Sequence, residues 1–319
     1  MVAISIMIEG QMGVTWPHWK RLVAEVEELG FVGMFRSDHF TNARPPDRDS
    51  LETIVSLTYL ADHTQRIHFG PLVAPFSFRH PVFLARQGAA IDDLSNGRMI
   101  LGLGAGWQER EHYLFGFDLG DLPTRMERFH EGLEVVTRLL KSAEPVSYQG
   151  AFYQLREAML LPRPQRPGGP PILIGGNGPR RTLPLVARYA DIWNAAFLPP
   201  AEFRSRSTQL DKLLLEAGRK PEDVRRTLMR AVFFGRDRAE LERRLRSFTN
   251  QPDYAGKSID DIVHTMTTQH YEIAGTADMI IEQIKTYAAA GVEELMLQWF
   301  DIDDIDGLRA FAASVLPHV

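Results

Sequence analysis

Apolar runs of strand length alternate with amphipathic helical stretches along most of the 319 residues. The runs predict eight strands, over 2–8, 31–35, 66–73, 98–107, 171–176, 190–195, 225–234 and 293–299. Between them, apolar side chains recur at helical spacing, as in the stripe of Trp19, Leu22, Val23, Val26 and Leu29 that Gly30 ends. Strands and helices in regular succession are typical of a parallel sheet covered by helices.

Eight strands in this order predict one (β/α)8 TIM barrel over residues 1–319. Two insertion segments interrupt the repeat, over about 107–170 and 235–275. The first is predicted to hold a long helix (124–141), a hairpin (145–155) that turns at Gln149–Gly150 and a proline-rich crossing segment (161–171). In the second, helices are predicted over 238–248 and 259–269, with an irregular stretch over 250–258 between them. A doubly wound open sheet is the alternative architecture.

Charge and composition narrow the range of functions. A net charge of −5 without a run of lysine or arginine argues against a nucleic-acid surface. Zero cysteines exclude disulfides and thiolate chemistry, and no histidine or acidic pattern suggests a metal site. No apolar run approaches the roughly 18 residues that cross a bilayer. The N-terminal strand pattern lacks the basic flank of a signal peptide, so we expect a cytoplasmic protein.

The fourth predicted strand carries glycines at every second position and ends at Trp107. The spacing of Gly102, Gly104 and Gly106 differs from the G-x-G-x-x-G of dinucleotide sites, and the acidic residue that those sites place about 20 residues later is absent. Gly106 leaves the backbone open to close approach, Trp107 can stack on a planar ring, and Gln108 can donate and accept hydrogen bonds. These residues predict a ligand loop; a tryptophan that simply packs in the core is the alternative.

Asp38 and His39 follow the second predicted strand. In a barrel, the strand ends share one face, where a carboxylate can hold a polar group and an imidazole can move a proton near neutral pH. Because neighbouring residues point apart, we expect two separate roles. A solvated loop pair, or Asp38 as a cap of the next segment, is the alternative.

Two further strand ends are unusual. Pro71 and Pro75 flank the end of the third strand and indicate an irregular exit, or else a plain strand terminus. After the fifth strand, the glycines of the stretch 175–182 would free backbone amides at the start of a helix, and Arg180 and Arg181 add positive charge. This stretch predicts an anion cradle; a glycine turn with exposed arginines is the alternative.

The chain resembles the bacterial luciferase-like monooxygenase superfamily, in its branch of oxidoreductases that use the deazaflavin coenzyme F420. The matching stretches span most of the chain, at 37–40 (Ser-Asp-His-Phe), 79–81 (Arg-His-Pro), 97–107, 175–178 (Gly-Gly-Asn-Gly) and 187–194 (Ala-Arg-Tyr-Ala-Asp-Ile-Trp-Asn). The resemblance implies a barrel that holds a flavin-type ring across the carboxyl ends of its strands. We therefore expect Asp38, Val73, Trp107 and Asn177 to meet at one mouth.

The resemblance also implies roles for individual residues. Asp38 would contact the ring or its hydroxyl end, His39 would face the substrate, and the segment 72–74 would back the ring. Relatives often have a non-prolyl cis peptide there, and Pro71 stands where they commonly carry threonine or serine. The expected catalytic residues are His39, Asp38 and Trp107, and the expected cofactor-binding residues are Asp38, Leu72, Val73, Ala74, Gly106, Gln108, Gly175, Gly176, Asn177, Gly178 and Arg180.

The leading hypothesis is hydride transfer between coenzyme F420 and a small organic substrate, with His39 as proton donor or acceptor. Relatives that oxidise sugar phosphates carry a glutamate after the glycine loop, and Trp107 at that place argues against such a substrate. A monooxygenase that uses reduced FMN, a non-redox barrel hydrolase or lyase, and a non-catalytic flavin-binding relative are the alternatives. Relatives are commonly homodimers, and the apolar helices near 51–60 and 82–91 could supply such an interface or pack on the barrel.

Overall fold

Parallel strands close into a barrel in the computed structural model, which describes residues 2–246 and 254–319. Neighbouring strands pair in the order β3 (His68–Pro71), β2 (Gly33–Arg36), β1 (Ala3–Ile8), β12 (Glu294–Gln298), β10 (Arg225–Phe234), β9 (Ile192–Ala196), β8 (Ile172–Gly175), β5 (Leu101–Gly104) and β4 (Ala74–Pro75). A parallel bridge between Phe69 and Met99 joins the two ends of this series. The predicted TIM barrel is confirmed.

The third barrel strand is divided in two. β3 pairs with β2 and β4 pairs with β5, so the chain crosses from one neighbour to the other between Pro71 and Ala74. The Leu72–Val73 peptide bond in this crossing is cis. The prediction of one strand over 66–73 is therefore wrong in its C-terminal part, because Leu72 and Val73 leave the sheet and turn toward the barrel mouth.

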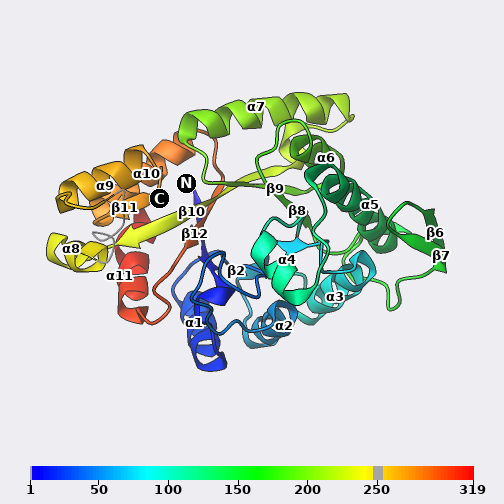
Figure 1. Ribbon diagram of the computed structural model, residues 1–319, viewed down its shortest axis with the longest axis horizontal. Coiled ribbons are helices and arrows are strands. Elements are labelled where there is room, and N and C mark those ends of the chain that lie inside the picture. The colour runs from blue at the N-terminus through cyan, green and yellow to red at the C-terminus, as the bar shows by residue number, and fades with distance from the viewer. Residues whose placement is uncertain (1, 247–253) are drawn as a thin grey trace.

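Helices surround the barrel in Figure 1. They are α1 (Trp16–Glu28), α2 (Thr53–His63), α3 (Pro81–Leu94), α5 (Leu122–Lys141), α6 (Thr182–Tyr189), α7 (Pro200–Glu216), α10 (Ala277–Ala289) and α11 (Ile305–Val315). The apolar stripe of α1 is buried from Trp19 to Val26, as its helical spacing predicts. None of the helices in the described part of the chain is long and apolar enough to cross a membrane.

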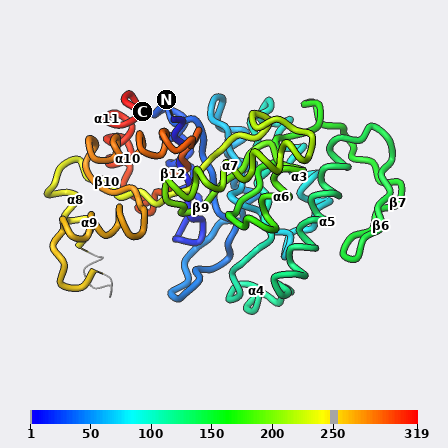
Figure 2. The backbone as a smooth tube through the Cα atoms, turned by 90° about the horizontal axis from the view of Figure 1, so that it is seen from above, coloured from blue at the N-terminus to red at the C-terminus, as the bar shows by residue number. Residues whose placement is uncertain are grey.

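Two groups of extra elements interrupt the barrel, and the β6–β7 hairpin of one and the α8–α9 part of the other lie at opposite ends of the molecule (Figures 1 and 2). Between β5 and β8 the chain forms α4 (Glu109–Phe115), α5 and the hairpin of β6 (Val146–Gln149) and β7 (Gln154–Ala158). Between β10 and β12 it forms α8 (Arg238–Leu245), α9 (Ile259–Thr268) and β11 (Ile273–Gly275), which pairs with β10. The end of the predicted helix 238–248 and the first part of the predicted irregular stretch 250–258 lie outside the described residues.

Candidate active site

A cavity of about 290 Å³ opens at the carboxyl ends of the barrel strands. Its described lining comes from β2, the divided third strand, β5, β8, β9 and β10, or the loops that follow them, and from α4. It comprises His39, Leu72, Val73, Pro75, Gly104, Ala105, Gly106, Trp107, Glu111, Gly175, Gly176, Asn194, Ala196 and Met229. His39, Val73, Trp107 and Gly176 thus meet in one place although more than 130 residues separate the first from the last. A site built from strand ends is what a barrel provides.

Val73 fills the space that neighbouring glycines leave bare. A Cβ atom on Gly104 would lie 2.4 Å from Cγ2 of Val73, and one on Gly175 would lie 3.1 Å from Cγ1. A Cβ atom on Gly102 would lie 2.0 Å from the carbonyl oxygen of Pro71. The alternating glycines of β5 therefore allow the divided third strand to approach, and Val73 forms a smooth apolar surface between β5 and β8.

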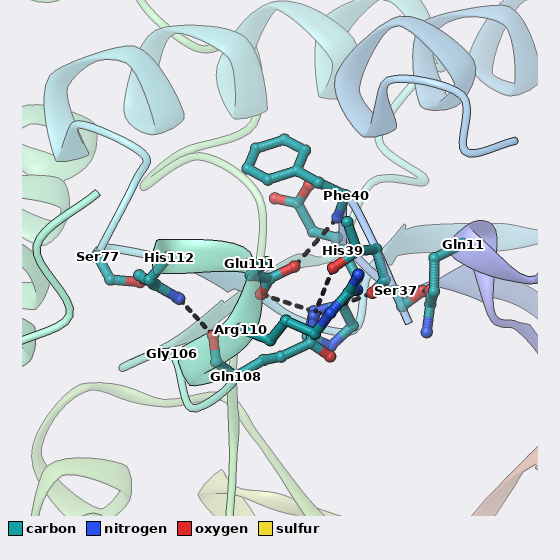
Figure 3. A network of polar contacts seen from close by, with 12 residues as sticks. Gln11, Ser37, His39, Phe40, Ser77, Gly106, Gln108, Arg110, Glu111 and His112 are labelled. Carbon is teal, nitrogen blue, oxygen red and sulfur yellow. Dashed lines mark hydrogen bonds and ion pairs between the residues drawn. The ribbon is translucent and has the colours of Figure 1, made fainter. Parts of the chain in front are cut away.

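A buried carboxylate holds His39 (Figure 3). Glu111 Oε1 lies 2.9 Å from His39 Nδ1, and Glu111 Oε2 accepts a hydrogen bond of 3.1 Å from the Phe40 N–H. The side chain of Glu111 is 1% exposed and that of His39 is 16% exposed. Because Glu111 accepts at Nδ1, a neutral His39 carries its proton there and presents Nε2 as a base.

The environment of His39 favours its protonated form. Burial lowers the pKa of His39, but the hydrogen bond and the negative charge of Glu111 outweigh it, and the net effect raises the pKa above its ordinary value. The ring of Trp107 meets the ring of His39 edge to face, with centroids 5.5 Å apart. His39 is thus fixed at the mouth by one polar and one aromatic neighbour, in a state that can release and regain a proton near neutral pH.

Asp38 points away from His39 and into an ion pair. Arg79 donates from Nε to Oδ2 of Asp38 and from Nη2 to Oδ1, the latter over 2.8 Å. Arg79 Nη2 also reaches Glu52 Oε1 at 2.6 Å. Asp38 is buried and does not line the cavity. The two neighbours therefore have separate partners, and a direct contact between Asp38 and a bound ring stays a prediction.

Replacing Arg79 with methionine is expected to lower the free energy of unfolding by about 3–5 kcal/mol, because it leaves the buried Asp38 carboxylate without its partner. Urea unfolding followed by circular dichroism measures this. The double variant with Asp38→Asn should recover part of the loss, whereas an equal loss in the single and double variants would show that the ion pair is not the cause.

Gln108 and His112 support the loop rather than face the cavity. Gln108 Nε2 donates to the carbonyl oxygen of Thr41 at 2.9 Å and to its hydroxyl at 3.2 Å. His112 contacts the Gln108 carbonyl through Nδ1 and the Ser77 hydroxyl through Nε2, both at 2.7 Å. The expectation that Gln108 binds a cofactor is not supported by this position, because its side chain is buried against Thr41 and is absent from the cavity lining.

The glycine stretch after β8 forms a turn that leads into α6. Gly176 adopts a φ of +127° and donates its N–H to the carbonyl oxygen of Asn194 over 2.9 Å. The side chain of Asn177 exchanges two hydrogen bonds with the backbone of Ala196, at 2.7 and 3.0 Å. Among the described residues, no acceptor is found for the N–H groups of Asn177 and Gly178. This turn can receive an anion through those two amides.

The crowding around Gly178 and the positive charge near the turn at 175–182 are consistent with anion binding there. A Cβ atom on Gly178 would lie 2.8 Å from the Thr182 hydroxyl, so a side chain there would obstruct the helix start. Arg180 and Arg181 are exposed at the same place. An apolar floor, a proton-transfer histidine and an anion turn suit a planar ring with an acidic tail. The described residues hold no cluster that could bind a metal ion.

Several lining residues were not predicted. Glu111 lies on α4, whose buried positions Glu111 and His112 are polar and give no apolar periodicity. Asn194, Ala196 and Met229 come from β9 and β10, where only the alternation of side chains along each strand indicates which residues face inward. A carboxylate one helical turn after Trp107 was the one available signal for Glu111.

Known proteins share both the sequence pattern and the fold. Residues 4–294 match a family model described as luciferase-like monooxygenase. An F420-dependent glucose-6-phosphate dehydrogenase of Amycolatopsis mediterranei (strain U-32) is 26% identical over 313 residues, covering 92% of this chain and 91% of the relative. The solved structure of an F420-dependent secondary alcohol dehydrogenase with an F420–acetone adduct matches at a TM-score of 0.83 and 18% identity, covering 98% of each chain. A monooxygenase from Streptomyces bottropensis matches at 0.81 and 22% identity, over 99% of each chain.

Proposed function

The chain belongs to the luciferase-like monooxygenase family, and from this premise we propose that it is an oxidoreductase that transfers a hydride between coenzyme F420 and a small organic substrate. The single observation that carries the proposal is the cavity in which His39, Val73 and Gly176 meet. Curated relatives that match over nine-tenths of the chain are F420-dependent dehydrogenases, which supports the choice of coenzyme.

The residues present fit the coenzyme. Val73 would form the floor under the ring, in a position that a Cβ atom on Gly104 would disturb. The amides of Asn177 and Gly178, with Arg180 nearby, would hold a phosphate of the tail. The deazaflavin, with carbon in place of the reactive flavin nitrogen, supplies two-electron hydride chemistry when bound, and the protein supplies binding and orientation.

His39 would move the proton that accompanies the hydride. In the oxidation of an alcohol, Nε2 of His39 would accept the hydroxyl proton as the hydride leaves carbon, with the coenzyme, when bound, as the hydride acceptor. In the reverse direction a carbonyl carbon receives the hydride and its oxygen receives the proton from the same nitrogen. Glu111 serves as a positioning residue, because it fixes the tautomer of His39 through Nδ1.

Replacing Glu111 with glutamine is expected to lower the pKa of His39, since burial is then opposed only by the negative charges of Glu9 and Asp38. NMR titration of the His39 ring measures this. The stabilisation that Glu111 provides through protonated His39 should be largest at low pH and should vanish as pH rises through the pKa of folded His39.

Glu109→Gln is the matched control, because Glu109 is exposed on the same helix. It should leave the His39 titration unchanged. An unchanged titration in Glu111→Gln as well would show that the carboxylate does not set the state of His39.

Titration of the purified protein with F420 and with FMN tests the proposal. F420 should bind more tightly, and Trp107→Phe should identify the part of the fluorescence quenching that arises at the cavity. Tighter binding of FMN would overturn the proposal in favour of an FMN-dependent monooxygenase. Binding of neither at micromolar concentration would favour a non-redox hydrolase or lyase.

A homodimer and a cytoplasmic location remain predictions. For the dimer we propose the outer faces of α2 and α3, where Val55 is 54% and Phe83 is 63% exposed. Sedimentation of the wild type and of a Val55→Lys, Phe83→Lys variant tests this interface, since charges placed on it would yield a monomer.

A further inference from the structure

A second, larger cavity of about 580 Å³ lies at the carboxyl ends of β10 and β12. Its size is that of a site for a small organic molecule. Its described lining consists of Met12, Val232, Phe233, Phe234, Arg244, Glu272, Trp299, Phe300 and Asp301. None of these residues lines the cavity around His39, and the hydride-transfer mechanism uses none of them.

The walls of this second cavity are mainly aromatic. The rings of Phe233 and Phe300 stack with centroids 5.9 Å apart and an angle of 27° between their planes. The indole N–H of Trp299 donates to the carbonyl oxygen of Asp301 over 2.9 Å, so Trp299 offers its apolar ring to the cavity rather than its polar atom. Such walls favour an apolar, ring-sized guest.

The charges on the lining do not suit an anion. Arg244 contacts Glu240 at 2.9 Å and Asp304 at 2.5 Å, so acidic side chains already neutralise it. Asp301 and Glu272 add negative charge to the same lining. A phosphate placed there would meet carboxylates and a guanidinium that is already paired, which disfavours its binding.

Glu272 offers an acceptor that the protein itself does not use. Its Oε2 atom is buried and has no hydrogen-bond partner among the described residues. Burial raises the pKa of Glu272, against the opposing effects of His270 and Arg230. A buried acceptor without a partner costs free energy unless a ligand or water supplies a donor, so Glu272 marks the point where a donor belongs.

One strand connects the two cavities. Met229 of β10 lines the cavity around His39, and Val232–Phe234 of the same strand line the second one. Figure 1 shows β10 running past the barrel toward α8. Phe233, four residues after Met229, lies on the same face of β10, and four residues of strand span about 13 Å. A molecule of about this length would extend from one cavity to the other.

We propose that the second cavity binds the body of the substrate, and that the substrate is a neutral, unphosphorylated molecule with an apolar ring and a hydrogen-bond donor for Glu272. This inference rests on the proposed function, since it identifies the class of molecule that the oxidoreductase acts on. The carbon that exchanges the hydride would lie beside His39, and the donor would lie in the second cavity beside Glu272.

Calorimetric titration of the 319-residue protein without added coenzyme tests the cavity directly. The probes are 2-naphthol, its methyl ether 2-methoxynaphthalene, and glucose 6-phosphate. We expect 2-naphthol to bind saturably, and the ether, which lacks the donor, to bind roughly tenfold or more weakly. Glucose 6-phosphate should not bind.

Two variants locate the binding. Phe300→Ala should weaken binding of 2-naphthol about tenfold or more, because it removes an aromatic wall. Glu272→Met keeps the length of the side chain and should abolish the difference between 2-naphthol and its ether. Tyr113→Ala on α4 and Glu282→Met on α10 replace an exposed aromatic and an exposed acidic residue outside both cavity linings and should change neither value.

Tighter binding of glucose 6-phosphate than of 2-naphthol would overturn the inference, as would wild-type binding of both naphthalenes by Phe300→Ala and Glu272→Met. Titration with F420 distinguishes a failure of this inference from a failure of the proposed oxidoreductase function. If F420 binds and the naphthalene pattern is absent, the inference alone fails. If the naphthalene pattern holds and F420 does not bind, the oxidoreductase proposal fails while the ligand class of the cavity stands.

Discussion

Replacing His39 with alanine is expected to reduce turnover by roughly 10²–10⁴-fold while the dissociation constant of F420 stays within about twofold. The loss follows from removal of the Nε2 atom that exchanges a proton with the substrate. The affinity should persist because Val73 and the turn at 176–178 are untouched by the substitution. Turnover is followed by the absorbance of F420 with a substrate of the class inferred above.

The matched control for this prediction is His63→Ala, because His63 is exposed at the end of α2 and lies outside the cavity lining. Exogenous imidazole should restore part of the turnover of His39→Ala and none in a variant that has lost the fold. A collapse of F420 binding in His39→Ala would instead assign His39 to the coenzyme site.

Replacing Gly104 with alanine is expected to weaken F420 binding by about two orders of magnitude. The new Cβ atom would lie 2.4 Å from Cγ2 of Val73, so Val73 must move from the surface on which the ring would lie. Loss of that apolar contact removes part of the burial that holds an aromatic ring. Equilibrium titration of F420 fluorescence gives the dissociation constant.

Gly132→Ala provides the control for general damage to packing. A Cβ atom on Gly132 of α5 would lie 2.6 Å from the ring of Phe76, a crowding similar to that at Gly104, but Gly132 does not line the cavity. This variant should lose stability and keep its affinity for F420. Equal affinity losses in both variants would mean that Gly104 acts through stability and not through the floor of the site.

Most of the fold is predictable because its signals are local. The bounds of β10 agree with the predicted strand over 225–234, since the apolar side chains from Leu228 to Phe234 are interrupted only by Arg230. Pro71 and Pro75 correctly indicate an irregular exit from the third strand. The division of that strand between β2 and β5 is not predictable from local signals, because it depends on glycines of β5 that are about 30 residues away. The short helix α4 was not predicted, because its buried residues are polar and give no apolar periodicity.

The candidate site is predictable in its location but not in its contacts. Of the four residues expected at one mouth, Val73 and Trp107 line the cavity, whereas Asp38 and Asn177 do not, and their chain neighbours His39 and Gly176 line it instead. The partner of Asp38 is Arg79, and the partner of Gln108 is Thr41, 67 residues earlier in the chain. Such pairings follow from the packing of loops that are distant in sequence, and the chemical character of a side chain does not reveal which way it faces.

The position of the α8–β11 segment has an evolutionary consequence. This segment lies at the end of the molecule opposite the β6–β7 hairpin, and it contributes Arg244 and Glu272 to the second cavity. The turn at 175–182, which would hold the phosphate of the coenzyme, belongs to another part of the barrel. Mutation or exchange of this one peripheral segment would change which substrates bind without changing the affinity for the coenzyme. A single scaffold can in this way diversify its selectivity while its redox chemistry is inherited unchanged.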